Sequence, residues 1–84
     1  MDNKMTQMTD QLVLQHIEEL VSQEHHLQGQ ESLSEDDRER LRRVQVELDQ
    51  CWDLLRQRRA LRMVGQDPNK AQVRPPEIVE KYVQ

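Results

Sequence analysis

The stretch from Ser34 to Val64 most constrains how this chain can fold, because neither proline nor glycine interrupts it. Its apolar residues recur at alternating steps of three and four, which is the spacing of one face of a helix. These residues are Leu41, Val44, Leu48, Cys51 and Leu55. Ser34 precedes three acids, a typical helix start in which the serine side chain caps free amides at the positive end of the dipole. The pattern predicts a helix over residues 34–64.

A second amphipathic pattern precedes this stretch. Its apolar residues are again separated by steps typical of one helical face, and they are Val13, Ile17, Leu20 and Leu27. Thr9 or Asp10 can cap the start of a helix here, and Gly29 can adopt the left-handed conformation that ends many helices. We therefore expect a helix over residues 10–28. The connection from Gly29 to Leu33 is short enough to return the second helix antiparallel to the first.

The expected fold is all-α, an antiparallel two-helix hairpin over residues 10–64 whose two apolar stripes form a seam like that of a coiled coil. Residues 1–9 are expected to form a flexible N-terminal segment. Residues 65–84 are expected to form an extended tail, because glycine and prolines break helix there, and to end in a short helix near 76–82. Because a chain of 84 residues buries only a modest fraction of its apolar surface alone, we expect a homodimer that forms a four-helix bundle.

Charge is divided unevenly between the two helices. The net charge is −4, and residues 1–33 carry six acids against one lysine, whereas residues 34–64 carry eight arginines against seven acids. Electrostatic attraction between the helices is the simplest interpretation. Glu24 lies on the first stripe, and counting outward from the connection places it opposite Arg38, with Arg42 one turn further on. The sequence therefore predicts a buried ion pair between Glu24 and Arg38 or Arg42.

The densest basic cluster of the chain follows its one tryptophan. Arg58 and Arg62 continue the apolar stripe of the second helix, which indicates a contact with acids. Those acids could belong to the first helix of a partner protomer, or to Glu77 and Glu80 of the tail. Tryptophan and arginine are both enriched at interface hot spots. We therefore predict one partner-binding surface, which comprises Trp52, Arg56, Arg58, Arg59 and Arg62.

Two further uses of the arginine cluster remain open. An acidic protein could dock on it, or a phosphate backbone could bind it, since a guanidinium group contacts two oxygens at once. The net acidity of the chain and the absence of aromatic residues between the arginines argue against nucleic acid. An acidic protein is therefore the more plausible of these two partners.

A metal-binding bundle is the third alternative. His16, His25 and His26 lie among the acids of the first helix, but of these only His16 has a carboxylate, Glu19, at helical spacing. Neither the zinc-protease motif nor the repeated motif of di-iron bundles is present. Adjacent histidines in a last helical turn interact favourably with the helix dipole without any metal. We therefore expect no metal site and no cofactor.

The sequence gives no sign of catalysis. Cys51 lies within the apolar stripe, where a packed thiol is the expected role, and as the only cysteine it cannot form an internal disulfide. There is no glycine-rich phosphate loop, and a hairpin offers little concavity from which to exclude water. We expect no enzyme, no catalytic residue and no small-molecule substrate. No apolar run approaches the ~20 residues of a membrane span and no signal peptide is recognisable, so we expect a cytoplasmic protein.

The run from Leu48 to Ala60, LDQCWDLLRQRRA, resembles the core signature of the domain of unknown function 2630 family of short actinobacterial proteins. Later segments resemble its C-terminal pattern: Gly65 with Asp67-Pro68, Val73-Arg74-Pro75, and Val79-Glu80 with Tyr82. The resemblance extends from about Met8 to Gln84, whereas residues 1–7 depart from the pattern. It implies a helical hairpin in which the Trp52 region and the tail matter together, and it carries over no activity and no catalytic residue.

Overall fold

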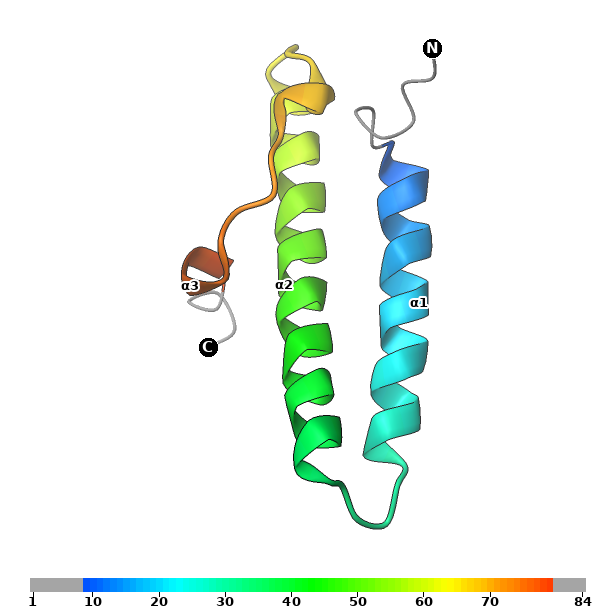
Figure 1. Cartoon of the computed structure of the whole chain (residues 1–84). Coiled ribbons are helices and arrows are strands. Elements are labelled where there is room, and N and C mark those ends of the chain that lie inside the picture. The colour runs from blue at the N-terminus through cyan, green and yellow to red at the C-terminus, as the bar shows by residue number, and fades with distance from the viewer. Residues whose placement is uncertain (1–8, 80–84) are drawn as a thin grey trace, which may run out of the picture.

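Two long helices packed side by side in opposite directions dominate the computed structural model, which describes residues 9–79 (Figure 1). Helix α1 spans Asp10–Gln28 and helix α2 spans Glu35–Met63. A single 3-10 turn, η1, follows at Pro68–Lys70, and a short helix, α3, at Pro76–Val79. The prediction of an all-α antiparallel hairpin with a tail that ends in a helical turn is confirmed.

Both long helices begin with the caps that the sequence predicts. The hydroxyl oxygen of Thr9 accepts a hydrogen bond from the amide of Leu12 at 3.2 Å, and that of Ser34 accepts one from the amide of Asp37 at 3.1 Å. Each hydroxyl thereby satisfies one of the amides that a first helical turn leaves without an intrahelical partner. The observed starts of α1 and α2 follow directly from these caps.

The two glycines end their helices differently, and the left-handed conformation predicted for Gly29 is wrong. Gly29 has φ −80° and ψ −5°, and its amide continues the helical pattern by donating to the carbonyl of His25 at 3.0 Å. Gly65, in contrast, has a positive φ of 77°, the one such value between residues 9 and 79. The amides of Gly65 and Gln66 donate to the carbonyls of Arg62 and Leu61, which is a Schellman motif that needs a left-handed residue. Gly65 therefore sets the sharp end of α2.

The core is one layer of side chains between the two helices. Its buried members are Val13, Ile17 and Leu20 from α1, and Val44, Leu48, Cys51, Leu54 and Leu55 from α2. Leu27 is also buried, whereas Leu41 is half-buried near the connection between the two helices. Val21 and Ala71 pack against the edges of the cluster. Burial of these apolar groups is the main stabilising term available to so short a chain.

The register of the two helices differs from the one counted outward from the connection. Arg40 lies beside Leu27 in the last turn of α1, so Arg38 lies beyond the end of that helix. The carboxylate of Glu24 accepts a hydrogen bond from Nε2 of Gln45 at 3.2 Å. Among the described residues, the predicted ion pair between Glu24 and Arg38 or Arg42 is not formed. The residues at the two ends of the connection do not face each other. Each residue of α1 therefore lies opposite a later residue of α2 than the count from the connection gives.

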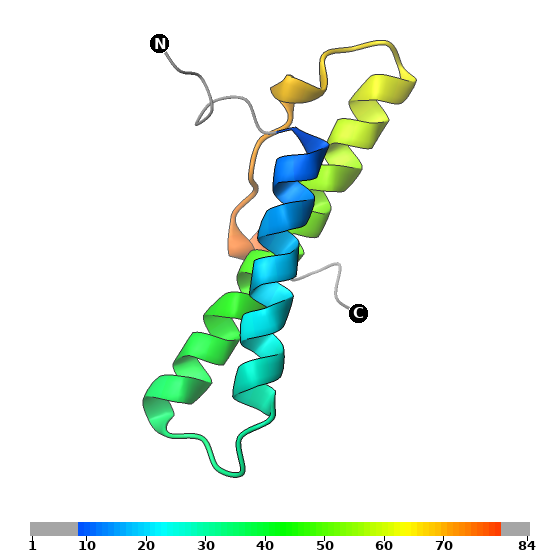
Figure 2. The same cartoon turned by 90° about the vertical axis from the view of Figure 1, so that its right-hand side faces the viewer.

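The tail returns along α2 on a face that α1 does not cover. Figure 2 shows it running down one side of the hairpin from η1 to α3. Both η1 and α3 contact α2, and Val79 of α3 is fully buried. The expected helix near 76–82 is described only as far as Val79. In the described part of the chain, no helix has the length and apolar character needed to cross a membrane.

Candidate interaction surfaces

Arg58 joins three elements at the open end of the hairpin. Its side chain is only 9% exposed, and its Nε donates a hydrogen bond to Oδ1 of Asp10 at the start of α1. Its Nη1 donates to Oδ1 of Asn69 in η1 at 3.0 Å and to the carbonyl of Pro68 at 3.4 Å. Arg62, one turn later, donates to Oδ2 of Asp10. We name Asp10, Arg58, Arg62 and Asn69 the Asp10 junction.

The Asp10 junction explains why the apolar stripe of α2 continues with two arginines, Arg58 and Arg62. The hydrogen bond from Arg58 and the positive charges of both arginines hold the pKa of Asp10 below its ordinary value, although partial burial opposes them. The acid that meets these arginines belongs to the chain's own first helix, whereas the sequence pointed to a partner or to Glu77 and Glu80. Glu80 lies outside the described residues. Arg58 and Arg62, which the sequence assigned to a partner-binding surface, thus make contacts within the chain.

A row of polar residues on α2 holds the tail. Nε2 of Gln57 donates to the carbonyl of Gln72 at 2.7 Å, and Oε1 of Gln57 accepts from the backbone amide of Gln72 at 3.2 Å. Nε2 of Gln50 donates to the carbonyl of Arg74 at 2.9 Å. Asp53, only 3% exposed, accepts from Gln57 at 2.8 Å and lies 3.5 Å from Nε of Arg74. We name Gln50, Asp53 and Gln57 the tail clamp.

Sequence reasoning missed the tail clamp, although a signal was present. Gln50, Asp53 and Gln57 follow one another at steps of three and four, the same spacing that identifies the apolar stripe. A polar row at helical spacing beside a tail that lacks secondary structure indicates side chains able to bond free backbone groups. The resemblance implied that the Trp52 region and the tail matter together. In the structure the adjacent residues Trp52 and Asp53 serve different faces of α2.

Exposed apolar side chains also lie on the side of the hairpin away from the tail clamp. At 100° per residue, Trp52 and Arg59 lie about 80–100° to one side of Cys51, whereas Gln50 and Gln57 lie about 100–120° to the other. Trp52 is 44% exposed. On α1, Leu14 is 43% exposed, and Val21 lies two turns further along the same face. We name this side the Trp52 flank, and it comprises Leu14, Val21, Asp49, Trp52, Arg56 and Arg59.

The Trp52 flank continues across both helices and contains a groove. Glu24, one turn after Val21, bonds Gln45 on the Trp52 side of α2, so the two helices share this flank. A groove of about 410 Å³ lies here, lined by Glu24, Arg42, Gln45, Val46, Leu48, Asp49 and Trp52. Its lining combines apolar and aromatic side chains with two carboxylates, one amide and the guanidinium of Arg42. We name it the Trp52 groove.

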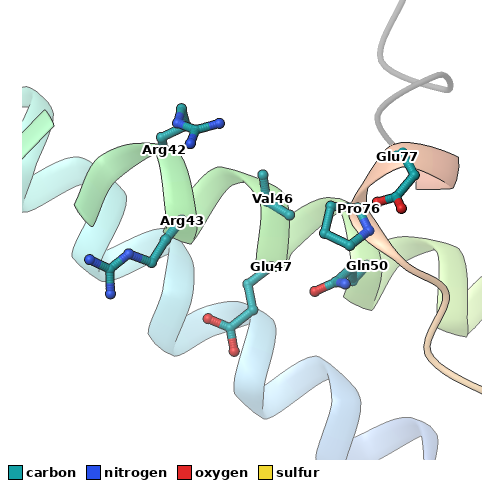
Figure 3. Close-up of a pocket in the computed structure, with 7 residues that line it drawn as sticks. All are labelled: Arg42, Arg43, Val46, Glu47, Gln50, Pro76 and Glu77. Atoms are coloured by element: carbon teal, nitrogen blue, oxygen red, sulfur yellow. The ribbon is translucent and has the colours of Figure 1, made fainter. Parts of the chain in front are cut away.

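A second hollow, of about 660 Å³, lies between α2 and α3. Its lining residues are Arg42, Arg43, Val46, Glu47, Gln50, Pro76 and Glu77 (Figure 3). Figure 3 shows the guanidinium groups of Arg42 and Arg43 pointing away from each other. Both lie near Glu39, at 3.9 and 3.8 Å, so their charges are partly neutralised. The hollow lacks a convergent set of polar groups that would fix a small ligand.

Comparison with known proteins places the chain in a family. Residues 9–84 match the model of the family described as Protein of unknown function (DUF2630). The chain belongs to the DUF2630 family. Over 78 residues it is 53% identical to uncharacterized proteins of Mycobacterium bovis and of two Mycobacterium tuberculosis strains, which covers 88% of this chain and 90% of each relative. No solved structure matches it. The resemblance inferred from the residues is confirmed.

The histidines of this DUF2630 chain are dispersed. His16 lies 3.8 Å from Glu19 on its own helix and 3.4 Å from Glu47 on α2, so it links the two helices. His25 and His26 are exposed in the last turn of α1. Within residues 9–79, no group of three histidine, cysteine or acidic side chains is arranged to hold a metal ion.

Cys51 is buried in the seam of this DUF2630 hairpin and is free. Burial raises the pKa of its thiol to about 11, and the negative charge of Glu47 adds to the effect. A nucleophilic or metal-binding cysteine needs a lowered pKa, because the thiolate is the reactive form. The chemistry of Cys51 at neutral pH is therefore that of an apolar packing group.

Proposed function

We propose that this protein is a non-enzymatic, cytoplasmic protein-interaction module whose first partner is a second copy of itself. The observation that carries the proposal is the contrast between the two sides of the hairpin. The tail covers one side through the tail clamp, whereas the Trp52 flank presents Trp52 and Leu14, each more than two-fifths exposed, and contains a groove that Trp52 lines. A single-layer core with one covered side and one apolar open side is completed by packing against another surface.

Self-association suits this flank better than the alternatives. Packing two hairpins flank against flank buries Trp52 and Leu14 of both copies, and it produces a four-helix bundle. Tryptophan is the residue most enriched among interface hot spots, so burying Trp52 provides a central anchor. An isologous dimer uses the same patch twice, so a single flank suffices to form it.

A nucleic-acid backbone is a weaker candidate partner. Arg58 and Arg62 are already bonded to Asp10, which removes half of the basic cluster from the surface available to phosphates. The flank that carries Arg56 and Arg59 also carries Asp49, with Glu24 at the groove. These carboxylates repel phosphate groups at short range. An acidic protein partner meets the same repulsion.

The test is the molar mass of the untagged protein by light scattering coupled to size-exclusion chromatography, across a dilution series. The chain mass is 10.1 kDa, so the expected dimer has twice that mass, roughly 20 kDa. Trp52→Gln is expected to shift the equilibrium to monomer while circular dichroism retains the helical signal. Leu12→Gln is the matched control, because Leu12 is 39% exposed and lies on the opposite side of α1. A folded wild-type monomer at every concentration overturns the proposal.

A further inference from the structure

The Trp52 flank is polarised along the axis of α2. Asp49 precedes Trp52 by three residues, and Arg56 and Arg59 follow it by four and seven, so all four lie on one helical face. Glu24 of α1 adds a second carboxylate to the end that contains Asp49. The end of the flank before Trp52 therefore carries two carboxylates against the one guanidinium of Arg42, and the end after Trp52 is basic.

The chemistry of the Trp52 groove suits a guanidinium group. Trp52 provides an aromatic wall, over which a cation is attracted by the quadrupole of the ring. Glu24 and Asp49 line the same groove, and the hydrogen bond from Gln45 at 3.2 Å holds the Glu24 carboxylate in place. Arg42 also lines the groove, but its guanidinium lies 3.9 Å from Glu39 on the preceding turn. Carboxylates beside an aromatic face form a binding site for the planar fork of arginine.

We propose that the Trp52 groove binds the side chain of Arg59 from a second copy of the chain. This inference rests on the proposed self-association and names the contact that would specify it. Arg59 lies seven residues after Trp52, and Gln45, a groove residue, lies seven residues before it. A two-fold axis beside Trp52, with the two α2 helices antiparallel, therefore carries the partner's Arg59 onto the Trp52 groove. Each separation is about 10.5 Å along the helix.

The same two-fold operation makes the rest of the flank complementary to itself. It brings Arg56, four residues after Trp52, close to the level of the partner's Asp49, three residues before Trp52. It also places the two Trp52 rings near the axis, where an isologous interface has its centre. Every attraction occurs twice, because each chain supplies both the acidic and the basic end. Such charge order fixes the antiparallel orientation and disfavours a parallel one, in which like charges would meet.

Charge reversal tests the contact. Arg59→Glu and Asp49→Arg are each expected to weaken the dimer at least about tenfold, measured as the dissociation constant by sedimentation equilibrium. A 1:1 mixture of the two variants is expected to restore part of the lost affinity, because the charge reversed at position 59 then meets the charge reversed at position 49, and the second contact of the pair is that of the wild type. Arg40→Glu is the matched control, since Arg40 is exposed away from the Trp52 flank, beside Leu27. It is expected to leave the dissociation constant unchanged.

The outcomes separate this inference from the proposal beneath it. A wild-type dimer that is unaffected by Arg59→Glu overturns the Arg59 contact and leaves self-association standing. Weakening in both variants without recovery in the mixture also overturns the contact, because the charges then act within each chain. A monomeric wild type overturns both. The emission of Trp52, the only tryptophan, gives an independent readout, since its quenching by acrylamide is expected to rise on dilution in the wild type and in Arg40→Glu alike.

Discussion

Arg58 donates a hydrogen bond from Nε to Oδ1 of Asp10, which lies 48 residues earlier in the chain. The contact joins the first residue of α1 to the last turns of α2, and the second guanidinium nitrogen of Arg58 joins both to Asn69 of η1. A two-helix hairpin is closed covalently at the connection only. The Asp10 junction closes the opposite end.

The Asp10→Asn variant tests how much this closure stabilises the fold. Asparagine keeps the size of the side chain but removes the charge and one of the two oxygens that accept from Arg58 and Arg62, so the buried guanidinium of Arg58 loses its anionic partner. We expect the free energy of unfolding in urea to fall by roughly 1–2 kcal/mol, after discounting for the solvent exposure of Asp10. Glu18→Gln, on the exposed face of α1, is the control and should change it little. Equal losses in the two variants would contradict the role of the junction.

The same contact predicts a pH dependence. Arg58 holds the pKa of Asp10 below its value of 3.8 in the unfolded chain. The stabilisation is therefore fully present above pH 3.8 and is lost as the pH falls through the lower, folded value. The difference in unfolding free energy between wild type and Asp10→Asn should be constant near neutral pH and should shrink below pH 3.8. A difference that persists undiminished into strong acid would show that the charge of Asp10 is not its source.

The periodicity of the sequence was sufficient to predict the helices but not their register. Each stripe specifies which face of a helix is buried, and the caps at Thr9 and Ser34 specify where it begins. Sliding one helix along the other preserves both stripes, so the pattern does not determine the offset. The contacts that determine the offset are polar pairs far apart in the sequence, from Gln45 to Glu24 and from Arg58 to Asp10. For that reason counting from the connection misassigned the partner of Glu24.

The sequence predicted only some of the exposed residues of the Trp52 flank, and the reason is related. Trp52 and Arg59 lie beside the stripe, so the periodicity places them at the edge of the core, and there they are found exposed. Arg58 differs from Arg59 by one position, but that step turns it by about 100° into the junction. An arginine stabilises the fold when an acid of the other helix lies within hydrogen-bonding distance, and otherwise it stays exposed on the surface. The sequence does not show which acid lies near which arginine.

The tail clamp yields a prediction about local opening. Gln57→Ala removes the side chain that bonds both backbone groups of Gln72 and also the neighbour of buried Asp53. The amide of Gln72 should therefore exchange with solvent deuterium faster, by about tenfold, as the tail opens more often. Gln66→Ala, an exposed position past the end of α2, is the control. Unchanged exchange at Gln72 in Gln57→Ala would mean that the other contacts of the tail with α2 hold it without Gln57.

The buried thiol of Cys51 gives a measure of the intact seam. Its pKa of about 11, against an ordinary value of 9.0, is a difference of two units, so at pH 8 the thiolate is about a hundredfold rarer than in the unfolded chain. Burial adds a steric barrier to a disulfide reagent. Labelling of the native protein should therefore be at least about a hundredfold slower than labelling in denaturant, and Cys51→Ser provides the blank. Rapid native labelling would require frequent separation of α1 and α2, because the thiol lies between Leu48 and Leu55 in the layer that joins them.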